Sequence, residues 1–370
     1  MQQRVIISQD IEHDLAQAIA ETEHDRVFVL TDDITQECCL PKVAVLFAKH
    51  NATTITIRHD DTNKTLATLA DVWTALQRSG ATRHSLLVNL GGGMVTDLGG
   101  FAAATFKRGI NFINIPTTLL AMVDAAVGGK TGINFGGLKN EVGAFANARY
   151  VIVNTCFLDT LDTANLCSGY AEMLKHSLIS NAQMWAEHVN FDILQPDLAE
   201  LQRMVAASIA VKEHIVADDP HEHGIRKALN FGHTIGHALE EFSMQQPGGA
   251  VVSARLLPLA KARTAPKNTL LHGYAVAFGL IGELYISARK AGFPTARLHQ
   301  TARFIRENYG AMAFTCDDYP TLLNLMRHDK KNTSDTINFT LLHDIGDIRI
   351  NQTATDEEIR EALDFIREGY

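Results

Sequence analysis

The sequence predicts an α/β domain followed by a mainly α-helical domain. Up to about residue 160, short apolar runs rich in β-branched residues alternate with amphipathic stretches, which is the pattern of βα units around a mostly parallel sheet. Beyond that point the alternation fades and long helical patterns replace it. A chain of 370 residues is also too long for one ordinary hydrophobic core. We therefore expect two domains, at residues 1–160 and 161–370.

The predicted elements follow these two patterns in order. In the first domain, strands are expected at 26–33, 52–61, 84–93, 110–118 and 149–155, with helices at 65–79 and 95–106 between them. In the second domain, helices are expected at 169–181, 198–217, 229–243 and 273–291. A small β excursion at 337–353 precedes a last helix, for which Thr355 and Glu358 supply a capping-box pattern.

Composition sets one segment, residues 245–271, apart from its neighbours. It holds three of the nine prolines and four basic residues but no acidic residue. Prolines and unbalanced charge are typical of an excursion between two helices. We predict a surface insertion here; the alternative is a lid or a contact for an anionic partner.

Charge and hydropathy exclude several classes of protein. The formal net charge of −9 opposes non-specific binding to nucleic acid. The N-terminus has no signal-peptide pattern, and no apolar run approaches the roughly 20 residues of a membrane span. Five cysteines without CxxC spacing argue against a disulfide framework or a structural zinc site, so reduced thiols are expected. We expect a soluble, cytoplasmic protein that binds neither nucleic acid nor a membrane.

Three glycines follow the third predicted strand, in VNLGGGMVTDLGG (88–100). A strand that runs into glycines and then a helix lets backbone N–H groups approach a pyrophosphate at the helix N-terminus. Gly91 and Gly93 fit the G-x-G-x-x-G fingerprint, but Thr96 stands at its last glycine and no acidic residue follows about 20 positions on. The motif alone leaves two alternatives, a dinucleotide site and a tight βα turn.

A second glycine-rich stretch, residues 123–145, surrounds Lys130, Lys139 and Asn140. It lacks the G-x-x-x-x-G-K-[ST] spacing of a P-loop. Flexible backbone and ammonium groups are nonetheless what phosphate recognition requires. A phosphate-binding loop and a solvated surface loop with lysines are equally open on this stretch alone.

Two histidines stand four residues apart in NFGHTIGHALEEF (230–242), a stretch that reads as a helix. His233 and His237 therefore project from one helical face, where they could share a metal ion. The H-E-x-x-H form is absent, because a threonine follows the first histidine. Glu172 and His272 are further candidate ligands, but their spacing from His233 does not nominate them. The alternative is a buried helical histidine held by a hydrogen bond.

Eight stretches in one order together resemble the 3-dehydroquinate synthases of the sugar phosphate cyclase superfamily. The stretches are GGGMVTD, FKRG, IPTTLLAMVDAAVGGKTGIN, LKNEVGAF, GYAEMLKHSLI, GIRKALNFGHTIGHALE, LHGYAVAFG and RHDKKN. Each one is a weak signal alone, but eight in the same order are not a chance match. The resemblance runs from about residue 26 to residue 345.

The resemblance implies a fold and an activity. The fold is a Rossmann-like, NAD-binding α/β domain followed by a mainly α-helical metal- and substrate-binding domain, with the active site between them, in a homodimer. The activity is that of a carbon–oxygen lyase of the shikimate pathway, which supplies chorismate and the aromatic amino acids. With NAD and a divalent metal, zinc or alternatively cobalt, it converts 3-deoxy-D-arabino-heptulosonate 7-phosphate to 3-dehydroquinate and phosphate. Transient oxidation, phosphate elimination, re-reduction and intramolecular aldol closure make up the reaction.

The resemblance also implies roles for individual residues. By motif position the metal ligands are Glu172, His233 and His272, while His237 becomes a hydrogen-bonding partner in the substrate site. The other substrate-contacting or catalytic positions are Asp124, Lys130, Asn140, Lys175, Lys212, Arg226, Asn230 and Lys330. Arg108 matches an arginine that reaches the phosphate of the substrate bound to the other subunit. The NAD contacts are Asp32, Lys64, Gly91, Gly92, Gly93, Asp97, Thr117, Thr118, Lys139 and Thr160.

The sequence departs from the family pattern at a few positions. Ala125 and Ala126 stand where serines are frequent, Asp61 stands where a glutamate is usual, and Tyr274 stands where a glutamate is frequent. None of these departures removes an implied metal ligand.

Three other functions compete with this interpretation. Another sugar phosphate cyclase, making a valiolone or an aminocyclitol precursor, is the nearest, but GGKTGIN and NFGHTIGH look more like the dehydroquinate branch. A metal-dependent polyol dehydrogenase related to glycerol dehydrogenase would give the many lysines and arginines no anionic partner. A non-catalytic protein that binds through its basic insertion would not need the intact ligand set.

Overall fold

The computed structural model describes residues 3–245, 251–252, 270–328 and 336–369, and the chain forms two compact units. The first unit comprises residues 1–161 together with 197–209, and the second comprises 162–196 with 210–370. Helix α8 (Leu198–Asp218) contributes residues to both units. The domain limits expected from the sequence stay a prediction. The predicted insertion at 245–271 lies almost entirely outside the described residues.

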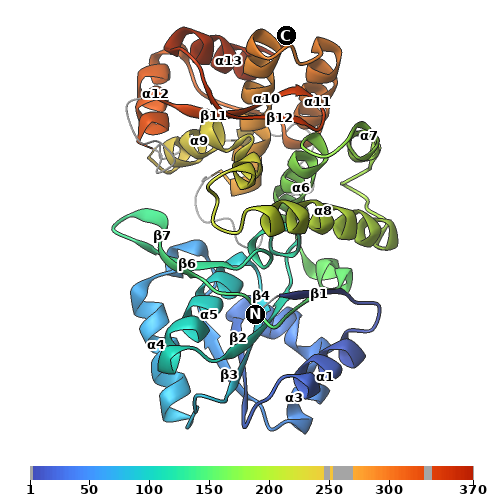
Figure 1. Cartoon of the computed structure of the whole chain (residues 1–370), viewed down its shortest axis with the longest axis vertical. Coiled ribbons are helices and arrows are strands. Elements are labelled where there is room, and N and C mark those ends of the chain that lie inside the picture. Colours follow the sequence, from blue (N-terminus) through green and yellow to red (C-terminus); the bar gives the residue numbers. More distant parts are fainter. Residues whose placement is uncertain (1–2, 246–250, 253–269, 329–335, 370) are drawn as a thin grey trace. The chain divides into compact units, whose positions relative to one another are not determined.

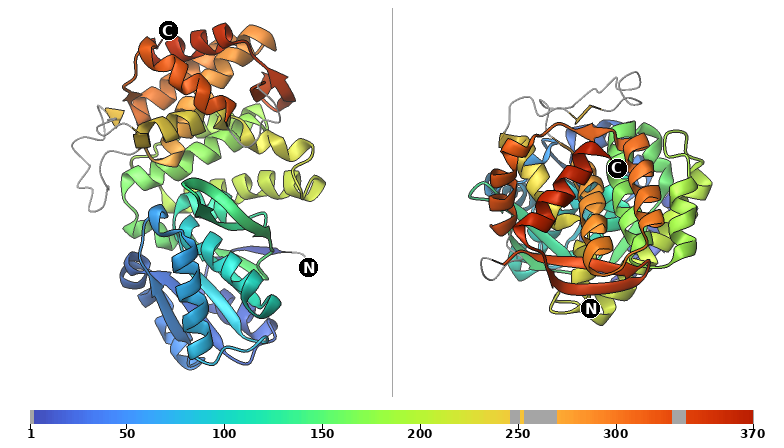
Figure 2. Two further views of the ribbon diagram at one scale, coloured as in Figure 1. Left: turned by 90° about the vertical axis from the view of Figure 1, so that its left-hand side faces the viewer. Right: turned by 90° about the horizontal axis from the view of Figure 1, so that it is seen from above.

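A six-stranded parallel sheet forms the centre of the first unit. Its strand order is β1-β8-β5-β4-β2-β3. Figure 1 shows α4 and α5 on one face and α1 and α3 on the other, and Figure 2 looks onto α4 and α5 with the sheet behind them. The strands are β1 (Arg4–Ile7), β2 (Val27–Asp32), β3 (Thr53–Ile57), β4 (Leu86–Gly91), β5 (Asn111–Pro116) and β8 (Tyr150–Val153). The helices are α1 (Ile11–Glu21), α2 (Asp33–Cys38), α3 (Ala44–Lys49), α4 (Leu66–Arg78) and α5 (Gly93–Thr105).

The strand order reverses beside β2, and this reversal marks the expected ligand-binding edge of the sheet. Strands β3 and β4 are consecutive in the chain, yet they lie on opposite sides of β2. In open α/β sheets, ligands bind outside the carboxyl ends of the strands at such a reversal. Asp32 ends β2 and Gly91 ends β4. The predicted α/β class is confirmed, and the glycine turn lies at the expected place in it.

The glycine-rich stretch at 123–145 is a β-hairpin for most of its length, so the expectation of a loop was wrong. Strand β6 (Lys130–Phe135) pairs antiparallel with β7 (Leu138–Phe145) in a separate two-stranded sheet (Figure 1). Gly136 and Gly137 have φ of +61° and +84°. Two positive φ values in a two-residue connection suit the twist of a hairpin, and adjacent glycines adopt them without strain.

The second unit is mainly helical, as expected. Two antiparallel strand pairs, β9 with β10 and β11 with β12, complete it. The capping box predicted for the last helix is present: Thr355 Oγ1 accepts from the Glu358 amide at 3.3 Å, and Glu358 Oε2 accepts from the Thr355 amide at 2.7 Å. The helices are α6 (Thr163–Leu178), α7 (Ala182–Asn190), α9 (His233–Gln245), α10 (His272–Lys290), α11 (Thr295–Tyr309), α12 (Tyr319–Arg327) and α13 (Asp356–Glu368). The strands are β9 (Val251–Val252), β10 (Ala311–Met312), β11 (Asn338–Asp344) and β12 (Asp347–Thr353).

Among the described residues, no helix is both long enough and apolar enough to cross a bilayer.

Candidate functional site

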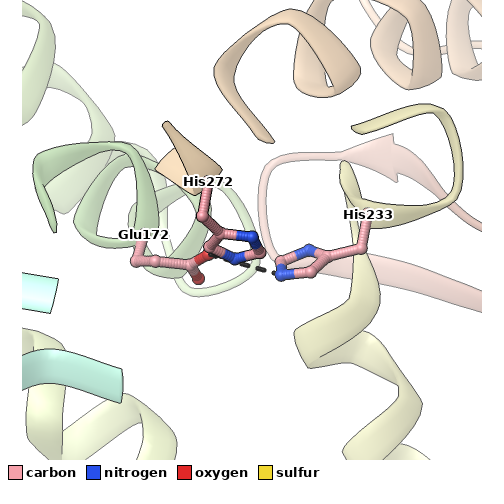
Figure 3. Close-up of side chains that lie close together, drawn as sticks. All are labelled: Glu172, His233 and His272. Carbon is pink, nitrogen blue, oxygen red and sulfur yellow. Dashed lines mark ion pairs between the residues drawn. The ribbon is translucent and has the colours of Figure 1, made fainter. Parts of the chain in front are cut away.

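Three helices of the second unit bring Glu172, His233 and His272 together. Glu172 lies within α6, while His233 and His272 are the first residues of α9 and α10. Glu172 Oε1 lies 3.3 Å from His233 Nε2 and 3.5 Å from His272 Nε2 (Figure 3). The three side chains converge although they are far apart in the sequence.

The geometry of this cluster fits a divalent metal ion. One ligand atom from each residue lies within 4.8 Å of the other two. A tetrahedral ion with ligands at about 2.0–2.1 Å keeps its ligand atoms about 3.3–3.4 Å apart, close to the distances from Glu172 Oε1. This oxygen is buried and has no hydrogen-bond donor among the described residues. Two imidazoles and a carboxylate are a ligand set that zinc sites use.

Hydrogen bonds orient both imidazoles in the same way. The His233 Nδ1–H donates to the carbonyl of Phe231 at 3.1 Å, and the His272 Nδ1–H donates to Glu240 Oε2 at 3.1 Å. The neutral form of each ring then carries its lone pair on Nε2, which faces Glu172. Burial opposes a charged ring, but Glu240 and Glu172 outweigh burial and raise the pKa of His272 to about 10. A metal ion would therefore displace a proton from this site.

Lys175 forms an ion pair with the second oxygen of Glu172 inside α6. Both side chains are almost completely buried. Burial alone would raise the pKa of Glu172, but Lys175 and His233 hold it well below its ordinary value. The carboxylate is thus ionised across the neutral pH range and available as a ligand.

Glycines allow the three helices to approach this closely. A Cβ on Gly273 would lie 1.8 Å from the carbonyl oxygen of Ser168 on α6, and a Cβ on Gly279 would lie 1.9 Å from the carbonyl oxygen of Gly232. Neither contact is possible for a larger residue without movement of the backbone. The amide of Gly273 also donates to Ser168 Oγ at 3.0 Å. The first turn of α10 is thereby fixed against α6.

A buried carboxylate that the sequence analysis missed fixes the start of α9. Glu283 on α10 is fully buried and accepts from the amides of Gly232, Thr234 and Ile235 at 2.7, 2.9 and 3.2 Å. It replaces the N-terminal cap that α9 would otherwise need, and it complements the positive end of the helix dipole. The signal in the sequence was a single acidic residue within the apolar run GYAVAFGLIGELYIS.

His237 completes a triangle of imidazoles in the second unit. Its ring centroid lies 5.2 Å from that of His233 and 5.8 Å from that of His272. It is half-buried, on the helical face that the four-residue spacing predicted. His237 also lies, with Glu240 and His272, in a second group of ligand atoms within 4.8 Å of one another.

A tight loop positions Arg226, which the resemblance placed in the substrate site. Asp219 accepts from the amides of His223, Gly224 and Arg226 at 3.0, 2.7 and 3.1 Å. Arg226 is buried, and its Nη1 donates to the carbonyl of Pro220 at 2.6 Å. Nearby, Asn230 Nδ2 donates to Glu222 Oε1 at 2.6 Å. Lys212 is buried on α8, and Lys330 lies outside the described residues.

In the first unit, the glycine turn leads directly from β4 into α5. Gly92 is the N-cap residue, and no side chain caps the helix. Its first amide groups can therefore bind an anion such as a pyrophosphate. A Cβ on Gly91 would lie 2.6 Å from the side chain of Val95, which shows why a glycine is needed there. The amide of Thr117 donates to the carbonyl of Gly91 at 3.0 Å, so it joins this turn.

Lys64 connects residues that the resemblance assigned to NAD and to substrate. Its buried Nζ donates to Asp97 Oδ2 at 2.5 Å and to Asn140 Oδ1 at 2.5 Å. Burial raises the pKa of Asp97, although the charge of Lys64 opposes this. Asn140 has a φ of +52°, so its backbone is held in the sparsely populated left-handed region.

The remaining assigned residues of the first unit have varied surroundings. Asp32 caps α2 by accepting from the Thr35 amide at 2.7 Å, so its carboxylate already has a structural role. Lys139 Nζ lies 3.5 Å from Asp61 Oδ2 at the surface. Arg108 is exposed, with a φ of +70°. Gly93, Thr118 and Asp124 are half-buried, while Lys130 and Thr160 are exposed.

Comparisons with known proteins decide among the competing functions. Family models described as 3-dehydroquinate synthase N-terminal and C-terminal match residues 54–168 and residues 169–257 with 260–332. A 3-dehydroquinate synthase of Parabacteroides distasonis is 50% identical over 369 residues, 100% of this chain and 99% of that protein. The chain belongs to the 3-dehydroquinate synthase family. It is an enzyme with that lyase activity, as the sequence motifs predicted.

A more distant member of the family supports the same conclusion. A 3-dehydroquinate synthase of Listeria innocua is 34% identical over 340 residues, which cover 91% of this chain and 86% of that protein.

Solved structures confirm the fold, and they include enzymes with the competing functions named above. A 2-deoxy-scyllo-inosose synthase complexed with carbaglucose-6-phosphate, NAD⁺ and Co²⁺ has a TM-score of 0.81 at 22% identity, covering 100% of this chain and 96% of that one. A 2-epi-5-epi-valiolone synthase from Streptomyces hygroscopicus with NAD⁺ and Zn²⁺ has a TM-score of 0.79 at 23% identity, covering 99% and 97%. Glycerol dehydrogenase from Schizosaccharomyces pombe has a TM-score of 0.63 at 12% identity, covering 99% and 88%. At these identities the likeness concerns the fold alone.

Proposed function

We propose that this 3-dehydroquinate synthase holds a divalent metal ion on Glu172, His233 and His272. The observation that carries the proposal is the position of Glu172 Oε1, buried without a donor and facing two Nε2 atoms at 3.3 and 3.5 Å. The metal we propose is zinc, with cobalt as the alternative. When bound, it supplies a Lewis acid that polarises substrate hydroxyl oxygens.

The second proposed cofactor is NAD, bound by the first unit. The uncapped start of α5 supports this, because its amides can receive the pyrophosphate. When bound, NAD supplies the acceptor and the later donor of one hydride. The proposed contacts are Asp32, Lys64, Gly91, Gly92, Gly93, Asp97, Thr117, Thr118, Lys139 and Thr160. The link of Lys64 to Asp97 and Asn140 would keep their side chains in place.

The proposed substrate is 3-deoxy-D-arabino-heptulosonate 7-phosphate, which carries a carboxylate and a phosphate. Five of the proposed contacts are lysines or arginine, and such cations in a chain of net charge −9 support an anionic substrate. Lys175 is already paired with Glu172, so we assign it to the orientation of the substrate hydroxyls near the metal. The proposed contacts are Asp124, Lys130, Asn140, Lys175, Lys212, Arg226, Asn230, His237 and Lys330. A homodimer, in which Arg108 reaches the other subunit's substrate, also remains a proposal.

Metal removal tests the proposed site directly. We expect the purified enzyme to hold about one divalent ion per chain, to lose turnover on chelation and to regain it with zinc. The His272→Ala variant should fold, as judged by circular dichroism, but lose both the ion and metal-dependent turnover. Full activity with one ion per chain in that variant would refute the assignment of His272.

A further inference from the structure

The packing register of α9 against α10 places Glu240 beside His272. The start of α9 lies against Gly279, where a Cβ would be 1.9 Å from the carbonyl oxygen of Gly232. One turn further along α9, a Cβ on Gly236 would lie 3.0 Å from the carbonyl oxygen of Ala275. The two helices therefore run antiparallel, and an advance of four residues along α9 corresponds to a retreat of four residues along α10. The next step of four residues brings Glu240 to Leu271, directly before the first residue of α10.

The contact between Glu240 and His272 is direct and largely buried. Glu240 Oε2 lies 3.1 Å from His272 Nδ1, and the glutamate is 5% exposed. A second bond holds the chain just before α10, because the Leu270 amide donates to Ser243 Oγ at 3.1 Å. Ser243 lies on α9, three residues after Glu240. The end of α9 thus fixes both the backbone before His272 and the imidazole itself.

We propose that Glu240 is a positioning residue for the metal site, acting through His272. By accepting the Nδ1–H, its carboxylate fixes the tautomer in which Nε2 carries the lone pair, and it holds the ring toward Glu172. Its negative charge also makes the imidazole a stronger ligand. The inference rests on the proposed metal site.

The main alternative is that Glu240 itself binds the metal. The ligand atoms of His237, Glu240 and His272 also lie within 4.8 Å of one another. In that arrangement Nδ1 would be the nitrogen of His272 nearer to Glu240, since it donates to Glu240 Oε2 at 3.1 Å. The ring instead presents Nε2 to Glu172 at 3.5 Å. The observed orientation therefore favours an indirect role for Glu240.

The test compares Glu240→Gln with Glu241→Gln on the same helix. Glu241 is the neighbouring residue and is exposed, so it controls for the loss of one negative charge. Zinc affinity is measured by competition with a chromogenic chelator, and the geometry of the site is followed by the visible absorption of bound Co²⁺. We expect Glu240→Gln to bind zinc about 10–100-fold more weakly than the wild type. The visible absorption spectrum of its bound Co²⁺ should keep the shape seen in the wild type. Glu241→Gln should match the wild type in both measurements.

The Glu240→Asp variant, whose side chain is one methylene shorter, separates the effect of charge on zinc affinity from the effect of packing. Glu240→Asp keeps the charge, so it should recover part of the affinity that Glu240→Gln loses. It also provides a second test if the glutamine variant does not fold.

Each other outcome rejects a specific claim. Unchanged zinc affinity in Glu240→Gln and in Glu240→Asp would overturn the inference and leave Glu240 a packing residue. A cobalt spectrum showing a lost ligand in Glu240→Gln would overturn it in favour of direct coordination. If the wild type bound no metal, the proposed function would fail rather than the role of Glu240.

Discussion

The ion pair between Glu172 and Lys175 shows how single residues set the chemistry of this site. Burying two charges costs several kcal/mol of desolvation for each ion, so such a pair adds little to stability. Its effect here is on ionisation, because Lys175 keeps the pKa of Glu172 well below its ordinary value. The pair therefore keeps the proposed metal ligand ionised within a largely buried helix.

Burial should make two of the cysteines unreactive. Loss of hydration disfavours a thiolate and raises the pKa of both Cys39 and Cys167 to about 12. At pH 8 only about one such thiol in 10⁴ would be ionised. We expect iodoacetamide to label the exposed Cys316 first in the native protein, whereas in denaturant all five thiols should react. Peptide mass spectrometry over time measures this.

Labelling of Cys39 or Cys167 at the rate of Cys316 in the native protein would contradict the burial of these thiols. The prediction of reduced cysteines itself agrees with the structure, because all five lie in the described part of the chain and form no disulfide.

Residue patterns predicted only part of the site. The four-residue spacing placed His233 and His237 on one helical face, but no spacing could bring Glu172 to them, because that contact depends on how three helices pack. The resemblance to a family supplied the partner. Sequence patterns did not single out Glu240 and Glu283. Their carboxylates bond to neighbouring groups because they are buried, and the burial of one acidic residue is hard to infer from the residues beside it in the sequence.

At the scale of elements, close packing of α10 determines where the proposed ligands meet. Glycine at 279 lets the helix touch the backbone at the start of α9, and glycine at 273 does the same against α6. A Gly279→Ala variant would place its Cβ 1.9 Å from the Gly232 carbonyl oxygen and 2.7 Å from the Gly236 amide nitrogen. We expect a loss of roughly 1–3 kcal/mol in stability, seen as a lower melting temperature. Zinc affinity should fall too, because His233 would move.

Arg289→Ala on the exposed side of α10 is the control for this variant. Its ion pair with Glu361 is at the surface, with 3.6 Å between Arg289 Nε and the carboxylate, so it contributes little. An unchanged melting temperature in Gly279→Ala would mean that α9 and α10 do not pack as closely as described.

The elements themselves were predicted unevenly. Buried parallel strands such as β2 and β4 read as continuous apolar runs, and their positions were found to within a few residues. Lysines and glycines at 123–145 predict a loop of a phosphate site, whereas the chain forms the β6–β7 hairpin there. The signal for a hairpin is the pair of adjacent glycines at 136 and 137, which suits a two-residue turn between two strands.

At the scale of the whole molecule, the fold does not choose the reaction. The same architecture occurs in a 2-deoxy-scyllo-inosose synthase, a 2-epi-5-epi-valiolone synthase and a glycerol dehydrogenase, with TM-scores between 0.63 and 0.81. Fold-level likeness is therefore compatible with several activities. What separates them is the set of side chains, and sequence identity of 50% to a 3-dehydroquinate synthase is the finding that selects one. The sequence motifs lead to the same activity because they contain those side chains.

A 3-dehydroquinate synthase uses NAD catalytically, with a metal, to eliminate phosphate from its substrate. The most direct measurement is phosphate release from 3-deoxy-D-arabino-heptulosonate 7-phosphate with NAD far below the substrate concentration, with the metal either present or chelated. We predict many phosphates per NAD, no accumulation of NADH, and loss of turnover on chelation. No phosphate release, or NADH that rises in step with an added polyol, would contradict this activity and indicate a dehydrogenase.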